Sequence, residues 1–386
     1  MPKPKILQVF SVPISLRFLE GQTLFWQNHG FDIHVACSDG VEVVPFCLKN
    51  KATFHVIPFV RNLYIFEIFR CVASINKLLK TLSPQIIHAN TPFASYITIF
   101  VAKFHSIPVR IYEVHGLPLE TASGLMKPIL WFLEKITCCF ATKVIAVSPS
   151  LKALMISKKL INPNKIEVMN LGSCNGVDSD FKFNPSKLVK NDISFLKDKY
   201  KLNSVQNIVG FIGRLTYEKG IHELYEAWQL TKTNFPNSKL LIIGSNDERR
   251  PLSKFWLGRL TTDSSIICVE HAEDIENYYA LIDFLVLPSH REGFGNVILE
   301  AASMKKSAIV SYVTGLKDAI IENETGMFFD CKDSSDLSKK ILFYLENPEI
   351  VQKHGISARK RVQTDFKPTD IWERKLETYR EGLRKA

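Results

Sequence analysis

Two glutamates eight residues apart, Glu292 and Glu300, mark the region where the sequence offers the clearest chemistry. A strand-like apolar run precedes them and a helical run follows, so we expect Glu292 in a strand-to-helix turn and Glu300 about two turns into the helix. Gly293 and Gly295 keep the backbone bare, and the N–H groups of residues 293–297 can therefore approach an anion at the helix start. A nucleotide-sugar would use both features, because amides bind its diphosphate while carboxylates accept hydrogen bonds from its sugar hydroxyls.

This segment reads Arg291-Glu-Gly-Phe-Gly-Asn-Val-Ile-Leu-Glu300, and it resembles the Glu, seven residues, Glu motif of retaining glycosyltransferases of the GT-B fold, especially family four. In that family the first Glu contacts the transferred sugar and the second hydrogen-bonds the ribose of the nucleotide. The resemblance implies these roles for Glu292, as a catalytic residue, and for Glu300. An acidic surface helix after a buried strand is the competing interpretation. The resemblance implies further nucleotide-sugar contacts from Gly293, Phe294, Gly295, Asn296 and Val297.

A pair of cations, Arg214 and Lys219, flanks a turn after a strand that ends at Gly213. Two cations at the carboxyl end of a strand can neutralise a diphosphate leaving group, because Arg offers a bidentate fork and Lys a mobile charge. The segment resembles the family's Gly-Arg-Leu, three residues, Lys-Gly motif, whose Arg and Lys bind the diphosphate. We therefore predict catalytic and nucleotide-sugar-binding roles for both cations, and a nucleotide-sugar contact for Gly213. Two surface charges around a loop are the alternative.

His115 ends a strand in the first half of the chain, within Ile111-Tyr-Glu-Val-His-Gly-Leu117. Family members carry a His or a similar residue there that hydrogen-bonds the donor sugar near the reacting centre. The resemblance thus implies a catalytic role for His115, whereas a lone His at a strand end can also be structural. We place Glu113 on the opposite face of the strand and leave it out of the site.

Another strand end carries residues that we assign to the acceptor. The run Ile87-His-Ala-Asn-Thr-Pro92 resembles the His-x-His-Thr-Pro segment of polysaccharide-assembly members, with Asn90 in place of the second His. This resemblance implies acceptor binding by His88 and Thr91. A capped strand-to-helix turn is the alternative.

Two loops add four further positions. Many relatives carry a Gly-Gly pair near the donor phosphate in the loop after the first strand, and here only Gly21 remains as a predicted nucleotide-sugar contact. Arg17 in the same loop is predicted to supply a charge, and we assign it to acceptor binding. Gly315 and Asp318 match a Thr-Gly, two residues, Asp pattern beside the nucleotide site of relatives. We interpret Gly315 as a turn residue and Asp318 as a cap or a ligand.

The elements that must position these residues alternate between strand and helix twice, which is typical of parallel sheets covered on both faces. The predicted fold class is therefore α/β, and the resemblance implies the GT-B plan of two Rossmann-like, doubly wound domains facing a cleft. We predict an N-terminal acceptor-binding domain over 1–175 and a C-terminal nucleotide-sugar-binding domain over 176–368. A terminal helix over 369–386 is expected to cross back to the first domain.

The uneven distribution of charged residues indicates which kind of partner the protein binds. Residues 1–175 hold 18 Lys and Arg against 9 Asp and Glu, whereas residues 176–386 hold 31 against 30, so nearly all of the net charge of +10 lies in the first half. Such a surface fits anionic lipid or a phosphorylated acceptor, and the absence of a reading motif disfavours nucleic acid. No apolar run reaches the ~20 residues that span a bilayer. The eight cysteines include no Cys-x-x-Cys, which disfavours zinc and a disulfide framework and fits a reducing cytoplasm.

Together these features predict a retaining glycosyltransferase that moves a hexose or N-acetylhexosamine from a nucleotide-sugar, with UDP favoured, to a saccharide linked to undecaprenyl diphosphate in capsule or O-antigen assembly. We expect no cofactor and no metal, because cations and helix amides replace a divalent ion. The protein is expected in the cytoplasm, bound peripherally to the anionic inner face of the cell membrane. The stretch Phe59–Arg70 is interpreted as an interfacial segment or as a core helix. A nucleotide-sugar 2-epimerase and a non-catalytic nucleotide-sugar-binding scaffold are the alternative functions.

Overall fold

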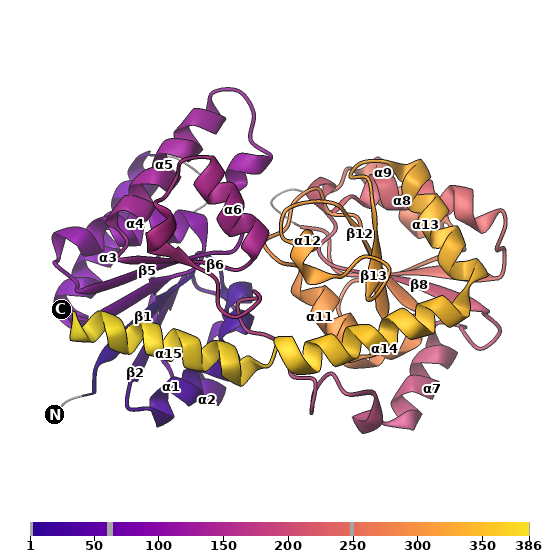
Figure 1. Cartoon of the computed structure of the whole chain (residues 1–386), viewed down its shortest axis with the longest axis horizontal. Coiled ribbons are helices and arrows are strands. Elements are labelled where there is room, and N and C mark those ends of the chain that lie inside the picture. The colour runs from indigo at the N-terminus through magenta and orange to yellow at the C-terminus, as the bar shows by residue number, and fades with distance from the viewer. Residues whose placement is uncertain (1–2, 60–64, 248–250, 386) are drawn as a thin grey trace. The chain divides into compact units, whose positions relative to one another are not determined.

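The computed structural model describes residues 3–59, 65–247 and 251–385. Contacts divide the chain into two compact units, the first made of Met1–Asn175 with Pro368–Ala386 and the second of Gly176–Lys367. Each unit contains one parallel sheet with helices packed around it (Figure 1). The predicted fold class is confirmed, since both units are Rossmann-like and the chain ends in a helix.

The sheet of the first unit has seven parallel strands in the order β3-β2-β1-β4-β5-β6-β7. The order reverses between β1 and β4, and doubly wound folds bind ligands at the carboxyl ends of strands beside such a reversal. The central strands are apolar runs because both faces are covered: all four residues of β4 are buried, whereas the edge strand β3 has no buried residue. The strands are β1 (Lys5–Val9), β2 (Asp32–Cys37), β3 (Thr53–Val56), β4 (Ile86–Ala89), β5 (Val109–Val114), β6 (Lys143–Ala146) and β7 (Ile166–Glu167).

Several helices of the first unit, among them η1, α4 and α6, have a proline in their first turn. Ser148 Oγ accepts a hydrogen bond from the Leu151 amide at 3.2 Å and Pro149 occupies the first turn of α6, as predicted. Helix α4 packs against both α3 and α5. The helices are η1 (Pro13–Leu19), α1 (Gln22–Asn28), α2 (Val43–Asn50), α3 (Ile65–Leu82), α4 (Pro92–Phe104), η2 (Pro118–Glu120), α5 (Met126–Phe140), α6 (Pro149–Ser157) and η3 (Pro163–Lys165).

The C-terminal helix α15 (Pro368–Arg384) belongs to the first unit by its contacts. It lies against α1 and β5, and the Tyr379 ring meets the edge of Trp26 at a centroid distance of 5.2 Å. Its pattern is amphipathic, as expected for a helix that covers a core on one side only. The buried side chains are Ile371, Lys375, Leu376 and Tyr379.

The sheet of the second unit has six parallel strands in the order β10-β9-β8-β11-β12-β13, with the reversal between β8 and β11. The two segments predicted to bind the donor follow these two strands. The strands are β8 (Asn207–Ile212), β9 (Ser238–Ile243), β10 (Ile266–Val269), β11 (Phe284–Leu287), β12 (Ser307–Ser311) and β13 (Gly326–Phe329). The helices are η4 (Pro185–Lys187), α7 (Lys190–Lys199), η5 (Tyr217–Lys219), α8 (Ile221–Lys232), α9 (Lys254–Thr262), α10 (Ile275–Leu281), α11 (Asn296–Ser303), α12 (Leu316–Ala319), α13 (Ser334–Glu346) and α14 (Pro348–Asp365). Among the described residues, no helix is long and apolar enough to cross a membrane.

Candidate active site

The turn between β11 and α11 forms the predicted anion site of the second unit. Gly295 precedes α11 with a φ of +86°, which favours glycine, and a Cβ there would meet Leu316 at 2.8 Å. Gly315 is a turn residue, as predicted: its φ is +80°, and an added Cβ would lie 2.5 Å from the Gly293 carbonyl oxygen. Phe294 is buried against Phe366, so its amide rather than its ring is placed for a ligand. The start of α12 therefore packs onto the turn that the two glutamates flank.

Glu292 and Lys219 come together although 73 residues separate them. The Lys219 ammonium pairs with Glu292 Oε1, and the same oxygen accepts a hydrogen bond from Ser289 Oγ at 2.9 Å. Both ends of this pair are mostly enclosed, with side-chain exposures of 20% and 15%. The cation neutralises the acid, and an acid beside an anion site is therefore compatible with phosphate binding.

Arg214 lies at the same edge of the sheet, after β8, but pairs with a different acid. Its guanidinium is more than half exposed and binds the carboxylate of Asp247, which follows β9. Gly244 permits the two strand ends to approach closely, since a Cβ there would lie 2.0 Å from the Gly213 carbonyl oxygen. The Asp247 side chain is only 9% exposed, whereas the Arg214 guanidinium can be reached from solvent.

Glu300 is held by a tyrosine that is absent from the predicted site. Tyr279 on α10 is fully buried, and its hydroxyl donates a hydrogen bond to Glu300 Oε2 at 2.8 Å. The same hydroxyl lies 3.2 Å from the carbonyl oxygen of Val297 in the first turn of α11. Tyr279 thus fixes the rotamer of the carboxylate that is predicted to bind ribose. We call Arg214, Lys219, Glu292 and Glu300 the donor cluster.

His115 follows the last residue of β5 and lies against Phe18, with ring centroids 5.2 Å apart and nearly parallel. Its Nε2 atom is enclosed and has no hydrogen-bond partner among the described residues. Burial lowers the pKa of His115 from 6.5 to about 4, even though the nearby Glu113 acts in the opposite direction. The imidazole is therefore neutral at pH 7.

The prediction that Glu113 points away from His115 is wrong. Glu113 Oε1 lies 3.9 Å from His115 Nε2, because residues two apart in a strand share a face. Glu113 is 1% exposed, and Lys375 of α15 donates to both carboxylate oxygens at 3.0 and 2.7 Å. Burial alone would raise the pKa of Glu113, but the Lys375 charge and the contact with His88 bring it well below its usual range. A full negative charge is thus buried two residues before His115.

A chain of close polar contacts continues from Glu113 through His88 to Tyr379. Gln8 Nε2 donates to the Tyr379 hydroxyl at 3.1 Å, so this hydroxyl is free to donate to His88 Nδ1 at 2.6 Å. His88 Nε2 then carries the proton and faces Glu113 Oε2 at 2.8 Å. Burial lowers the pKa of His88, in agreement with a neutral ring. We call the set Gln8, His88, Asn90, Glu113, Lys375 and Tyr379 the buried network.

The remaining predicted residues of the first unit lie around the loop after β1. Thr91 Oγ1 accepts a hydrogen bond from the Ser11 amide at 2.7 Å and so shapes this loop. Arg17 is exposed and lies over the Phe18 ring at 5.5 Å. Gly21 has a φ of +80°, and an added Cβ would meet the Trp372 ring of α15 at 2.4 Å, so its close approach is to that helix. Both His88 nitrogens face protein groups. Acceptor binding by His88, Thr91 and Arg17 stays a prediction, and so does the contact of Gly21 with the donor.

Two family models match the chain. The model described as "Glycosyl transferases group 1" matches residues 192–361, and the model described as "Glycosyltransferase Family 4" matches residues 23–181. The first match contains the whole donor cluster. The second contains His115 and much of the buried network.

Relatives cover the chain from end to end. The capsular polysaccharide biosynthesis glycosyltransferase CapM of Staphylococcus aureus is 31% identical over 100% of this chain and 99% of its own length. The UDP-Gal:alpha-D-GlcNAc-diphosphoundecaprenol alpha-1,3-galactosyltransferase of Escherichia coli is 27% identical over 88% of this chain and 86% of its own. Among solved structures, Anabaena HepE in complex with UDP and glucose matches with a TM-score of 0.80 at 18% identity, covering 98% of this chain and 100% of that one. At that identity the structural match supports the fold alone.

Proposed function

This chain belongs to the glycosyl transferases of group 1, and we propose that it transfers a hexose or N-acetylhexosamine, with retention, from a UDP-sugar to a lipid-linked saccharide. The observation that carries the proposal is the Lys219–Glu292 pair in the turn before α11. It puts a cation, an acid and the start of a helix in one place, which suits a ligand with both phosphates and sugar hydroxyls.

The donor cluster supplies the groups that this reaction needs. Arg214, Lys219 and the amides of 293–297 neutralise the diphosphate as it leaves, while Glu292 accepts hydrogen bonds from the transferred sugar. Glu300, fixed by Tyr279, accepts from the ribose hydroxyls. The prediction that no metal is required rests on these cations and amides and stays a prediction.

The proposed chemical step is the one that the family resemblance implies. The acceptor hydroxyl oxygen bonds to the anomeric carbon as the bond from that carbon to the diphosphate oxygen breaks. The hydroxyl proton passes to the departing phosphate, and attack occurs on the face that the leaving group vacates, which gives retention. The neutral imidazole of His115 is proposed to hydrogen-bond the transferred sugar and takes no charge in the step.

The acceptor class is supported by relatives. The Escherichia coli relative is named for a diphosphoundecaprenol acceptor, and a Campylobacter jejuni relative, 26% identical over 71% of this chain, is named for a diphospho-undecaprenol acceptor as well. CapM is named for capsular polysaccharide biosynthesis. We therefore assign this chain to assembly of a surface polysaccharide on a lipid diphosphate.

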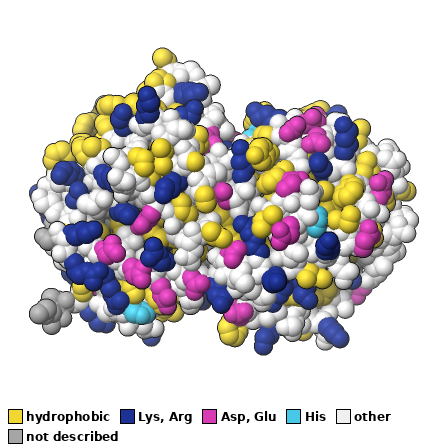
Figure 2. Space-filling model, viewed as in Figure 1, with side chains coloured by type: hydrophobic (Ala, Val, Ile, Leu, Met, Phe, Trp, Pro, Cys, Tyr) yellow, Lys and Arg dark blue, Asp and Glu magenta, His cyan; other side chains and the backbone are white. Residues whose placement is uncertain are grey.

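A peripheral position on the anionic inner face of the cell membrane is part of the proposal. The stretch Phe59–Arg70 includes residues 60–64, which lie outside the described residues, but Phe66 and Phe69 on α3 are 80% and 64% exposed. Exposed aromatic rings continue on α4 and α5, and Figure 2 shows hydrophobic side chains gathered on this side of the first unit with Lys and Arg among them. We call Phe66, Phe69, Phe100, Phe104 and Phe132 the aromatic face. Aromatic rings beside cations suit the headgroup region of an anionic bilayer.

A screen of radiolabelled nucleotide-sugars against membrane lipid extracts tests the proposal. We expect one donor to give a labelled product that partitions with lipid, and we expect no conversion of the donor when lipid is left out. Epimerisation of the nucleotide-sugar without an acceptor would favour the 2-epimerase. Donor binding with no product from any lipid extract would favour the scaffold.

A further inference from the structure

The first unit contains a pocket of about 550 Å³ that no predicted residue lines. Its walls come from the loop after β5, from α5 and from α6. This volume lies within the range of small-molecule sites, roughly 300–1,000 Å³. Its lining residues are Leu117, Leu119, Glu120, Lys127, Pro128, Trp131, Leu154 and Lys158.

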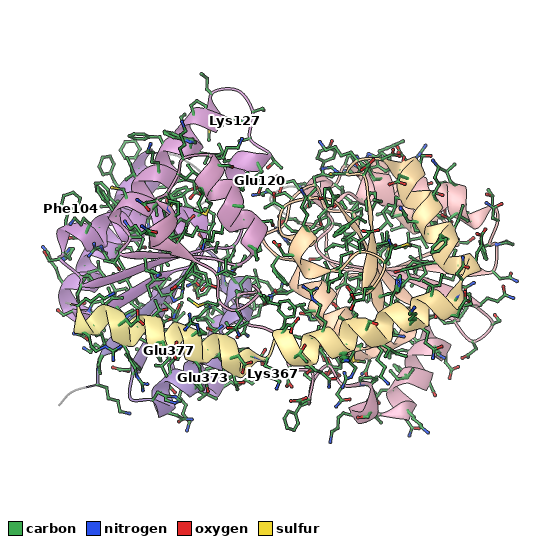
Figure 3. All side chains as sticks on the ribbon, in the orientation of Figure 1. Phe104, Glu120, Lys127, Lys367, Glu373 and Glu377 are labelled. Atoms are coloured by element: carbon green, nitrogen blue, oxygen red, sulfur yellow. The ribbon has the colours of Figure 1, made fainter. Side chains whose placement is uncertain are left out.

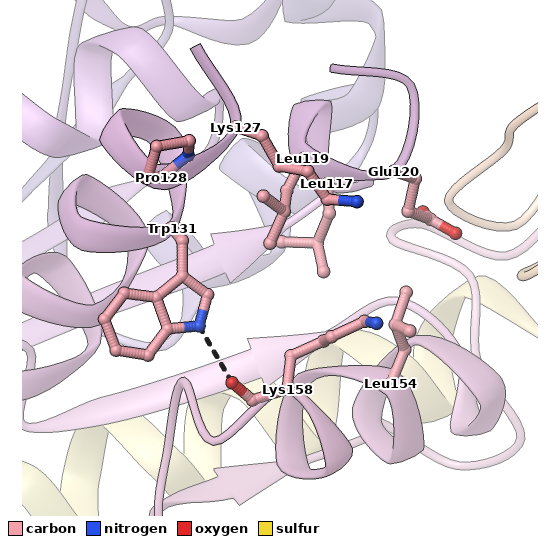
Figure 4. A pocket seen from close by; sticks show the side chains of 8 residues that line it. All are labelled: Leu117, Leu119, Glu120, Lys127, Pro128, Trp131, Leu154 and Lys158. Atoms are coloured by element: carbon pink, nitrogen blue, oxygen red, sulfur yellow. Dashed lines mark hydrogen bonds between the residues drawn. The ribbon is translucent and has the colours of Figure 1, made fainter. Parts of the chain in front are cut away.

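The lining is divided between an apolar part and a charged end. Figure 4 shows the Lys127 and Lys158 ammonium groups at the side of the pocket away from Trp131, with the leucine side chains between. Neither ammonium has a hydrogen bond or ion pair with another described residue. Trp131 is anchored, because its indole N–H donates to the Lys158 carbonyl oxygen at 2.9 Å. A rigid apolar wall therefore ends in two cations that form no ion pair with a described acid, although Glu120 lies at the same end of the pocket.

We propose that this pocket binds the lipid-diphosphate part of the acceptor, an inference that rests on the proposed function for the identity of that lipid. Lys127 and Lys158 bind the two charges of the diphosphate, and the leucines with Trp131 pack on the first isoprenoid units. A membrane phospholipid carries a single phosphodiester charge and two chains, so it matches two cations at the end of one pocket less well. Glu120 lies at the same end, and its carboxylate suits hydroxyl groups of the saccharide beside the diphosphate.

Two features of the surroundings fit such a ligand. Leu117 follows His115 by two residues, so the pocket adjoins the strand end at which sugar transfer is proposed. On α5 and just before it, Leu125, Ile129 and Phe132 are exposed at helical spacing, next to the pocket residues Lys127 and Trp131. Figure 3 labels Lys127 and Glu120 at one edge of this unit and Phe104 of the aromatic face at another. A lipid chain too long for the pocket would thus leave it along apolar surface.

The test measures binding of farnesyl diphosphate, geranyl diphosphate and inorganic pyrophosphate to the full chain by calorimetry. We expect affinity to rise with chain length. The double variant Lys127→Ala/Lys158→Ala should weaken farnesyl diphosphate binding by roughly 10-fold or more, the scale of losing charged hydrogen bonds. Leu154→Gln should weaken farnesyl diphosphate but leave pyrophosphate unchanged.

The matched control is Lys77→Ala/Lys80→Ala, which removes the same charge from exposed positions of α3 outside the pocket. It should bind farnesyl diphosphate as the parent does. Equal affinity in the pocket variant and the parent would overturn the proposal, and so would an equal loss in the control. Farnesyl diphosphate that binds no tighter than pyrophosphate, or that dihexanoyl phosphatidylglycerol displaces equally well, would also overturn it.

Sugar transfer separates this inference from the function on which it rests. If the parent transfers sugar to lipid-linked acceptor and Lys127→Ala/Lys158→Ala keeps the parent KM for that acceptor, the pocket assignment is wrong and the function stands. If the parent transfers no sugar but the farnesyl diphosphate pattern holds, the function is wrong and the pocket remains a prenyl diphosphate site.

Discussion

The donor cluster and the buried network use the same kinds of charged side chain in opposite ways. Arg214 is 57% exposed and Lys219 is 20% exposed, and each pairs with a single acid, whereas Lys375 is 2% exposed and donates to both oxygens of Glu113 and to the Cys174 carbonyl oxygen. Arg214 and Lys219 each retain some exposure, but a fully buried pair cannot lose one member without leaving the other charge unpaired. The second unit therefore keeps cations that a diphosphate can recruit, and the first unit uses its charges to fix a strand end and a helix.

The largest effect is expected from breaking the buried pair. Lys375→Met leaves the Glu113 carboxylate without its cation, and the free energy of unfolding should fall by about 3–5 kcal/mol. Glu113→Gln combined with Lys375→Met should recover part of this loss, because no unpaired charge remains. Arg374→Met is the matched control: its exposed pair with Glu377 lies one residue away on α15 and should change stability by no more than about 1 kcal/mol. Denaturant unfolding of the full chain measures the stability of all three variants. An equal loss of stability in Lys375→Met and Arg374→Met would contradict a structural role for the buried Lys375–Glu113 pair.

Substitutions in the donor cluster should lower the rate of sugar transfer rather than the stability of the protein. Lys219→Ala and Arg214→Ala should each slow transfer by roughly 10²–10³-fold, the scale of losing one group that stabilises charge in the transition state. Lys232→Ala serves as control, because Lys232 pairs with Asp263 on the same unit and is assigned no role in transfer. Turnover of the two cluster variants close to that of the control would remove Arg214 and Lys219 from the mechanism.

The two glutamates should separate binding from transfer. Glu292→Gln should lower turnover more than it weakens binding of the free nucleoside diphosphate, because Glu292 is assigned to the sugar and not to the nucleotide. Glu300→Gln should weaken binding of the nucleoside diphosphate itself, since it is assigned to the ribose. Calorimetry with UDP, alongside turnover, distinguishes them. Two variants that bind UDP as the parent does and remain active would show that the paired acids are wrongly assigned.

The pH dependence of stability should test whether burial keeps His115, beside the buried network, neutral. Burial lowers the pKa of His115 from 6.5 to about 4, so between these values the unfolded chain binds a proton that the folded chain does not. Stability should consequently fall as the pH drops from about 6.5 to about 4, and His115→Gln should lose less over the same range. Comparison with the parent cancels the contribution of Glu134, whose pKa is raised by burial without any influence of His115. Parallel pH profiles of the two proteins would mean that His115 is not held neutral by burial.

The smallest effect is expected at the aromatic face. Binding to anionic vesicles should be weak and should decrease with salt, because long-range attraction is screened over about 8–10 Å at 0.10–0.15 M salt. Phe100→Ser/Phe104→Ser should reduce vesicle co-sedimentation, whereas Phe195→Ser, at an equally exposed ring of the second unit, should not. Equal binding to neutral and anionic vesicles, or none to anionic vesicles at low salt, would contradict the membrane proposal.

Sequence reasoning performed well where the contacts are local or follow a known pattern. The two parallel sheets, the Ser148 cap and the terminal helix were accessible because strands and helices alternate with clear spacing and because short turns have strong residue preferences. The pairing of Lys219 with Glu292 follows from both lying at the carboxyl ends of neighbouring strands β8 and β11.

The buried network could not be predicted from the sequence, because its members are far apart in the chain. Lys375 and Glu113 are 262 residues apart, and a lysine on an amphipathic helix carries no sign that its charge faces the core. The position of Glu113 could have been predicted correctly, because residues two apart in a strand, such as Glu113 and His115, share one face. Gly21 shows the same difficulty, because the ring that requires a glycine there, Trp372, belongs to α15.

The central claim is retaining sugar transfer by a chain whose donor cluster carries the chemistry, and proton NMR of the transfer product tests it most directly. With the donor identified by the lipid screen, the parent should yield a lipid-linked saccharide whose new anomeric proton has the same configuration as in the nucleotide-sugar. Lys219→Ala should yield the same anomer more slowly. A product of inverted configuration, or conversion of the nucleotide-sugar with no glycosidic product, would contradict the account.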